Sequence, residues 1–335
     1  MYVAQNINTP FVFIKRRKPK TTIVFDTYWI FAAKRQDIFF KRVNGIASPW
    51  TNDPVLSQYK FTNAYRASDR VSQYLIKHVI KSGSQKSNEL FFRIILFKLF
   101  NKIGTWKALE KINGEVSFKN YDFETYNDVL KKLKADGTIY SSAYIMASGR
   151  SSFGYPKKHQ NHLKLLERMM SDNLPEKIQH LNNLESLYNS LMSYPTIGPF
   201  LAYQFSIDIN YSNLTDFSEM EFVKAGPGAK DGIRKCFSSL GDYSEGDVIR
   251  MMADIQQDEF RRLNLDFKNL WGRPLQLIDC QNLFCEVDKY SRVAHPDIAG
   301  ISNRTRIKQK FNPNKGIINY VFPEKWGLAV KRKVQ

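Results

Sequence analysis

The sequence predicts an all-α protein. Its long segments place apolar residues at steps of three and four, the period of a helix that buries one face. It contains no series of alternating β-branched segments, which would indicate a sheet. A chain of 335 residues that is 43% hydrophobic and 14% aromatic can bury a sizeable core. We therefore expect one large helical domain or two that pack closely together.

The first helices follow from this spacing. Apolar residues step by three to five positions within 25–46, which predicts a helix there. The segment PWTNDP at 49–54 predicts a loop, because its prolines fix φ and remove hydrogen-bond donors. Apolar residues return at helical steps from Phe92 to Trp106, and Gly104 is expected to bend or end that helix.

Further helices are expected in the middle of the chain. Residues 123–135 repeat the helical pattern and stop at the turn dipeptide Asp136-Gly137. The run at 146–159 collects Gly, Ser, Pro and basic residues, which predicts a mobile surface loop. Two more helices should follow, at 160–171 and 175–193.

The charge of the chain points to a polyanionic partner. Fifty Lys and Arg residues against 32 Asp and Glu residues leave a net charge of +18. The sequence has no stretch of about 18 consecutive apolar residues, so nucleic acid is a better candidate than a membrane. Three cysteines without C-x-x-C spacing and five scattered histidines argue against a metal site and for a reducing compartment. We expect a cytoplasmic monomer that binds double-stranded DNA without a metal or cofactor.

Charge and motifs divide the chain into four parts. Residues 1–24 form a basic N-terminal segment with the run PFVFIKRRKPK, which is either an arm on DNA or a solvated tail. Residues 25–150 form an N-terminal helical part, and 151–310 carry the motifs expected to contact DNA and to perform catalysis. Residues 311–335 form a basic C-terminal tail.

A hairpin between two helices is the first candidate for DNA contact. In YPTIGPFLAYQFSIDI a helix should begin at Pro199, directly after Gly198. The free N–H groups of a helix N-terminus favour a phosphate, as in a helix-hairpin-helix. That hairpin usually has two glycines, whereas here Thr196 stands at the first position. An ordinary helix-loop-helix is the alternative.

A second glycine turn follows in EFVKAGPGAKDGIRKCF. Gly226 and Gly228 can adopt φ values that other residues avoid, and basic residues surround them. No G-x-x-x-x-G-K-[ST] occurs in the sequence, so DNA backbone fits this turn better than ATP. The basic candidates are Lys224, Lys230 and Arg234. A helix C-cap followed by a turn is the alternative.

The segment LQLIDCQNLFCEVDKYSRVAHP is the main candidate for catalysis. Asp279 is expected at the N-cap of a helix, and Glu286 lies further along it. A carboxylate can activate water or stabilise positive charge on a sugar, so both are catalytic candidates. Lys289 and Arg292 are candidates for DNA contact. A plain N-cap and a solvated face of ion pairs are the alternatives.

Residues for a base pocket are expected in FTNAYRASDR. A base flipped out of DNA is read by polar groups and stacked on aromatic rings. Asn63, Arg66 and Asp69 are the polar candidates in this segment, and Tyr65 is a stacking candidate. Outside it, the candidates are Trp29 for stacking and Gln281 for hydrogen bonding. A role in the core is the alternative for the aromatic residues.

Several of these motifs together resemble a known family. The motifs are PWTNDPVLSQYKFTN, YRASDRVSQYLI, FKLFNKIGTW, AGPGAKDGIRKCF and FCEVDKYSR, and the resemblance spans roughly 25–300. They resemble the α-glutamyl/putrescinyl-thymine pyrophosphorylase-like proteins, which are tied to hypermodified bases in phage DNA and related to helix-hairpin-helix DNA glycosylases. The resemblance implies a glycosylase-like helical fold, base flipping and a modified pyrimidine substrate.

The resemblance also carries expectations for activity. A member of similar type acts in phage defence as a glycosylase on glucosylated hydroxymethylcytosine. In such enzymes a catalytic Asp opens the helix after the hairpin, which favours Asp279. Asp216, 18 residues after Gly198, is the second candidate. We expect a DNA glycosylase that excises a modified base in anti-phage defence; alternatives are a pyrophosphorylase-type enzyme acting on hydroxymethyl-pyrimidine in DNA and a non-catalytic DNA-binding module.

Overall fold

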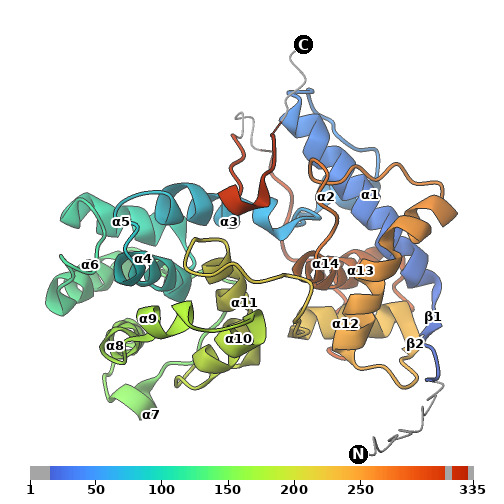
Figure 1. The fold of residues 1–335 in the computed structure, drawn as a ribbon. Helices are drawn as coiled ribbons and strands as arrows, with labels where there is room; N and C mark the ends of the chain where they lie inside the picture. The colour runs from blue at the N-terminus through green and yellow to red at the C-terminus, as the bar shows by residue number, and fades with distance from the viewer. Residues whose placement is uncertain (1–15, 314–318, 331–335) are drawn as a thin grey trace, which may run out of the picture.

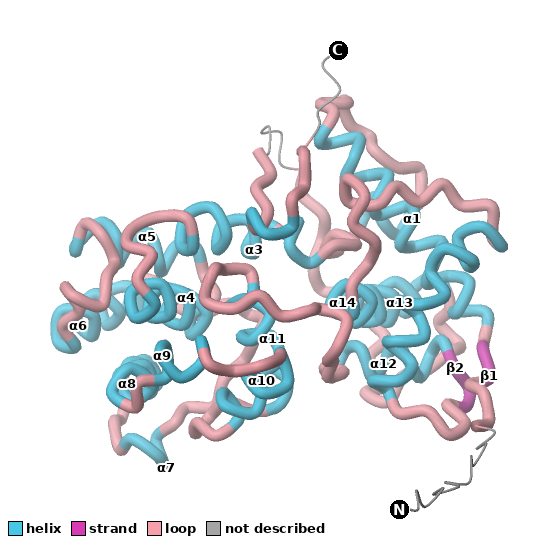
Figure 2. Tube along the Cα trace, in the orientation of Figure 1, coloured by secondary structure: helices cyan, strands magenta, loops and turns pink. Residues whose placement is uncertain are grey.

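The computed structural model describes residues 16–313 and 319–330, and it consists of two helical lobes (Figure 1). The predicted all-α class is confirmed: in the described part, strands are confined to β1 (Lys20–Thr21) and β2 (Phe237–Ser239), which pair antiparallel (Figure 2). Residues 1–15, the larger part of the predicted basic N-terminal segment at 1–24, lie outside the description, as do 314–318 and 331–335 of the predicted tail.

One lobe, which we call the α14 lobe, gathers helices from both ends of the chain. Its long first helix packs on α12 and α14, so that segments more than 180 residues apart in sequence share one core. Tyr28 of that helix is fully buried and donates a hydrogen bond to the Cys280 carbonyl, 3.1 Å away. The lobe comprises α1 (Ile23–Val43), α2 (Pro54–Gln58), α12 (Pro227–Cys236), α13 (Glu245–Arg262) and α14 (Leu277–Ala294).

The other lobe, the α4 lobe, is continuous in sequence. Its centre is α4, whose side chains are buried from Glu89 to Phe100 and which packs on α8, α9 and α11. The lobe comprises α4 (Ser87–Phe100), α5 (Ile103–Asn113), α6 (Phe123–Ala135), α7 (Arg150–Phe153), α8 (Lys158–Ser171), α9 (Leu174–Gln179), α10 (Leu184–Met192) and α11 (Pro199–Asn210).

Short elements connect the lobes. The chain passes from the α14 lobe through the 3₁₀ turn η1 (Arg66–Ser68), α3 (Arg70–Tyr74) and the π-helix η2 (Leu75–Ile80) before it enters α4. A second 3₁₀ turn, η3 (Glu324–Trp326), lies in the red segment near the junction of the lobes in Figure 1. The predicted C-terminal tail therefore contributes ordered structure between the lobes.

Some helix boundaries differ from the prediction. The predicted helix at 175–193 is two helices, α9 and α10, because Asn183 begins a new helix by accepting a hydrogen bond from the Ser186 N–H. The expected helix from Phe92 to Trp106 ends at Phe100, where Asn101 adopts the left-handed conformation. Asn tolerates that conformation better than most residues, which explains the stop.

Part of the basic N-terminal segment is neutralised within the fold. Arg16 pairs with Asp247 at 2.9 Å, and Arg17 pairs with Asp242 at 2.7 Å. Both acidic residues belong to the turn and first residues of α13. In this structure these two arginines thus contact protein carboxylates.

Candidate active site

A buried ion triad links the connecting segment to the α4 lobe. The Arg66 guanidinium binds Asp208 with both Nη atoms, at 2.8 and 3.0 Å, and Lys98 approaches the same carboxylate to 3.0 Å. Burial acts to raise the pKa of Asp208, but Arg66 and Lys98 together hold it below its usual value. Because removing one partner would leave a buried charge uncompensated, this triad fixes Arg66 in place.

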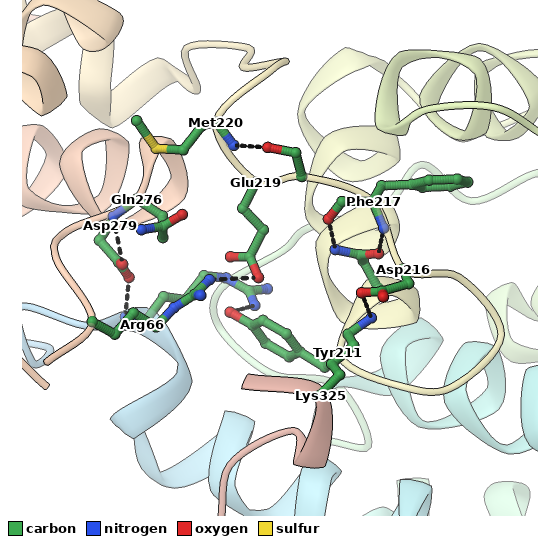
Figure 3. Close-up of polar contacts among 12 residues, drawn as sticks. Arg66, Tyr211, Asp216, Phe217, Glu219, Met220, Gln276, Asp279 and Lys325 are labelled. Atoms are coloured by element: carbon green, nitrogen blue, oxygen red, sulfur yellow. Dashed lines mark hydrogen bonds and ion pairs between the residues drawn. The ribbon is translucent and has the colours of Figure 1, made fainter. Parts of the chain in front are cut away.

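Asp279 ties the same segment to the α14 lobe. Its carboxylate accepts hydrogen bonds from the backbone N–H groups of Arg66 at 2.8 Å and of Gln276 at 3.1 Å (Figure 3). The prediction that Asp279 is the N-cap is wrong: Gln276 occupies that position, and Asp279 reaches back to it from the third residue of the helix. Burial raises the pKa of Asp279 to about 6, although both backbone hydrogen bonds lower it.

Glu219 is a site residue that sequence reasoning missed. It lies in the loop after α11, is 5% exposed, and pairs with Arg273 of the loop before α14 at 3.0 Å. Burial raises the pKa of the Glu219 carboxyl to about 7, although Arg273 lowers it. The pair thus adds the buried carboxylate of Glu219 to those of Asp208 and Asp279. Nothing in the periodicity marks these two loop residues, which lie 54 positions apart.

Asp216 occupies a different environment. Its side chain is 84% exposed, and the Lys325 Nζ lies 3.6 Å away (Figure 3). Lys325 also donates to the Ser212 and Thr215 carbonyls, so it anchors the C-terminal segment to this loop. Asp216 therefore lacks the buried surroundings that Asp279 and Glu219 share.

The predicted hairpin lies between α10 and α11. Gly198 is the N-cap of α11, as expected, and Pro199 is its first residue. Thr196 has φ +71°, a conformation that strains a β-branched side chain, and its Oγ1 is buried with no described partner. The turn thus requires a positive φ at position 196, which glycine adopts without strain but where the sequence has threonine.

The second turn serves packing as well as any contact with DNA. A Cβ on Gly226 would lie 2.7 Å from the ring of Phe200, and one on Gly228 would lie 3.2 Å from the Cys285 Sγ. The two glycines therefore let the N-termini of α11 and α12 approach each other and α14. The basic residues Lys224, Lys230 and Arg234 are exposed around this turn.

Most polar residues on the predicted α14 face are paired inside the protein. Glu286 accepts a hydrogen bond from the Thr62 N–H at 2.9 Å and pairs with Lys289 at 2.7 Å. Arg292 pairs with Asp288 and donates to the Arg306 carbonyl. The ion pairs that were expected as the alternative to a catalytic face are therefore present on α14. They are largely buried, however, and not solvated. Gln281 accepts a hydrogen bond from Gln204, which also binds Arg66.

The base-pocket candidates do not form one surface. Asn63 accepts a hydrogen bond from Arg35 at 3.0 Å, and its N–H donates to Asp69 at 2.8 Å. Burial raises the pKa of Asp69 to about 7. Tyr65 is buried and donates to the Arg273 carbonyl, whereas Trp29 is fully buried in the core. Among these candidates, Arg66 contacts a buried carboxylate in each lobe: its backbone N–H binds Asp279, and its guanidinium binds Asp208.

Within 16–313 and 319–330, no group of three or more His, Cys, Asp or Glu side chains is placed to hold a metal ion. In the same ranges, no helix has both the length and the apolarity that crossing a bilayer requires.

Together these features define a two-lobed helical protein with buried carboxylates and arginines where its lobes meet. The chain belongs to the family described as "5-hmdU DNA kinase, helical domain", which matches residues 22–300. It is 28% identical over 306 residues to a 5-hmdU DNA kinase of Bacillus phage SP10, covering 85% of this chain. The chain spans about half of that relative, 48% of its length. No solved structure matches the chain.

The comparisons correct the expected activity. The relative and the family are named for a kinase, which is a transferase, so the expected DNA glycosylase that hydrolyses an N-glycosyl bond in anti-phage defence is wrong. The expected relation to proteins that act on modified pyrimidines in phage DNA is supported. The similarity to a pyrophosphorylase-like family thus pointed to related proteins named for a modified base in DNA, but not to the kinase reaction in their name.

Proposed function

We propose that the chain acts on 5-hydroxymethyl-pyrimidines in DNA and holds the modified base where the two lobes meet, for group transfer onto its hydroxymethyl oxygen. The name of the relative supplies this substrate class. The observation that carries the proposal is the pair of buried carboxylates, Asp279 and Glu219, set beside Arg66 and Arg273. Such carboxylates with raised pKa values are typical of sites that move protons.

The transfer requires that the hydroxymethyl group lose its proton. In the proposed step, the hydroxymethyl oxygen forms a bond to the terminal phosphorus of a nucleoside triphosphate. The bond between that phosphorus and the bridging oxygen breaks, and a nucleoside diphosphate leaves. A carboxylate accepts the hydroxymethyl proton. Glu219 suits this role better than Asp279, because both oxygens of Asp279 already accept backbone N–H groups. A carboxyl with a pKa of about 7 can accept a proton near neutral pH.

DNA binding is proposed to use the α11–α12 side of the molecule. The N-termini of α11 and α12 lie close together through the contact of Gly226 with Phe200. Lys230 and Arg234 are exposed one turn apart on α12. Exposed N–H groups at helix starts and unpaired cations are what a phosphate backbone contacts.

Recognition without transfer is the second candidate. It is favoured by the sequence, which contains no G-x-x-x-x-G-K-[ST] to hold the triphosphate. In that case the chain binds the modified base and presents its hydroxymethyl group to a phosphate-donor site elsewhere.

One experiment separates these functions. The purified chain is incubated with ATP labelled at the γ-phosphate and with duplexes that carry one 5-hydroxymethyl-2′-deoxyuridine or one thymidine. Label on the modified duplex alone supports transfer. Preferential binding without label supports recognition. Equal binding of the two duplexes without label overturns the proposal.

A further inference from the structure

Trp326 covers the arginine of the candidate site. Its ring centroid lies 3.9 Å from the Arg273 Cζ, the shortest distance between a cation and an aromatic ring among the described residues. The Tyr211 ring meets the same indole edge-on, at 5.5 Å between centroids. An aromatic ring therefore lies directly against a guanidinium between the lobes.

The Arg273 guanidinium is held in place by an ion pair. Its Nη2 binds the nearly buried Glu219 carboxylate at 3.0 Å, whereas its Nε is buried without a hydrogen-bond partner among the described residues. A guanidinium plane fixed by a carboxylate stacks well on aromatic rings, including nucleobases. The geometry thus offers a platform for a flat heterocycle next to a carboxylate.

The segment that carries Trp326 is anchored at two points, by Val321 near its start and by Lys325, which precedes Trp326 and donates to the Ser212 and Thr215 carbonyls. Two hydrogen bonds, at 2.8 and 3.0 Å, join Val321 to the Gln73 side chain. Further along, Glu324 pairs with Lys81, but the Glu324 side chain is 76% exposed, so this pair adds little stability. The Trp326 indole N–H donates to no described residue.

A cavity lies beside this segment. It has a volume of about 300 Å³, and its lining includes Ile76 and Ile80 of the π-helix, Tyr211, and Pro323 next to the turn that bears Trp326. Because Lys325 holds the backbone of the turn, Trp326 can leave Arg273 only by rotating its side chain. The cavity offers space beside Tyr211, whose ring contacts the Trp326 indole.

We propose that the Arg273 guanidinium face is the stacking site for the pyrimidine flipped out of DNA, and that Trp326 occupies this face until the base displaces it. The inference rests on the proposed function, since it names where that base is held. A base on this face lies beside Glu219, the carboxylate assigned to its hydroxymethyl proton. Trp326 is then a built-in competitor of the substrate.

The test compares two tryptophans that each lie on an arginine. Trp326→Ala removes the competitor, and Trp50→Ala is the matched control, because the Trp50 ring lies 5.1 Å from Arg42. We expect Trp326→Ala to bind a duplex with one 5-hydroxymethyl-2′-deoxyuridine about tenfold more tightly than the unchanged protein, equivalent to ~1.4 kcal/mol. Trp50→Ala should bind it as the unchanged protein does. Trp326→Leu keeps an apolar side chain without a ring, and serves if the alanine variant does not fold.

Fluorescence of the unchanged protein supplies an independent measurement. DNA binding should change the emission of Trp326, a change that Trp50→Ala retains and Trp326→Leu loses. Arg273→Lys keeps the charge but removes the plane, and should lose the preference for the modified duplex. Weaker binding by both Trp326 variants, or Trp326 emission that DNA leaves unchanged, overturns the stacking site.

The same measurements separate this inference from the proposed function. If the unchanged protein binds modified and unmodified duplexes equally, the proposed function fails. The emission of Trp326 then still decides the stacking site, because displacement by any flipped base changes it. If the preference exists but Arg273→Lys keeps it, the proposed function stands and the stacking site is wrong.

Discussion

Gly232→Ala should destabilise the protein through the contact between α12 and α14. A Cβ at Gly232 would lie 2.0 Å from the Phe284 carbonyl oxygen and 2.6 Å from its carbon, both backbone atoms. Real Cβ atoms essentially never approach closer than 3.0 Å, so the two helices must separate by about 1 Å. Overpacking that shifts backbone costs about 3 kcal/mol of unfolding free energy, at the upper end of the usual range.

Gly104→Ala is the matched control. Gly104 lies in the first turn of α5, and a Cβ there would meet nothing within 4 Å. Alanine in a helix is favoured over glycine by up to about 1 kcal/mol, so this variant should be slightly more stable than the unchanged protein. Urea unfolding at one pH gives both values. If Gly232→Ala unfolds at the same urea concentration as Gly104→Ala, the close approach of α12 and α14 is wrong.

Three further predictions concern the hairpin, the DNA surface and pH. Thr196→Gly should stabilise the protein by about 1 kcal/mol, because φ is +71° there; a lower melting temperature would contradict this. Lys230→Ala and Arg234→Ala should each reduce the slope of log affinity against log salt by about 1, whereas Lys289→Ala, already paired, should leave it unchanged; equal slopes for all three would exclude α12 from the interface. Because burial raises the folded-state pKa of Glu219 from 4.5 to about 7, its protonated form favours the folded state. The contribution of Glu219 to the free energy of unfolding is fully present below pH 4.5 and is lost as pH rises through about 7. The free energies of unfolding in urea at pH 5 and pH 8 should therefore differ less in Glu219→Gln than in the unchanged protein.

The sequence pattern predicted the helices better than their ends. Spacing of apolar residues located the long helices, since one buried face is a local property. The division of 175–193 was also readable, because Asn183 is a strong N-cap residue within that run. Asp279 was placed near the right helix start but at the wrong cap position, because Gln276 is a rarer N-cap than Asp.

The assembly of the site was not readable from local sequence. Glu219 and Arg273 lie in separate loops, and only the packing of the lobes brings them together. One signal was available in the C-terminal segment: NYVFPEKW contains Tyr320, Phe322 and Trp326, which a solvated basic tail would rarely carry. Two of these rings are buried in the structure, and the third covers Arg273.

Arg66 explains why the lobes and the site depend on each other. Its backbone N–H binds Asp279 of the α14 lobe, while its guanidinium binds Asp208 of the α4 lobe. One residue therefore fixes both lobes relative to each other, through Asp279 on one side and Asp208 on the other. Because Asp279 accepts this N–H, its oxygens are less available for proton transfer than those of Glu219, whose described hydrogen-bonding partner is the side chain of Arg273. The geometry thus distinguishes Asp279, which holds the lobes together, from Glu219, the carboxylate that we propose accepts the proton, and the spacing of acidic residues along the chain does not contain this distinction.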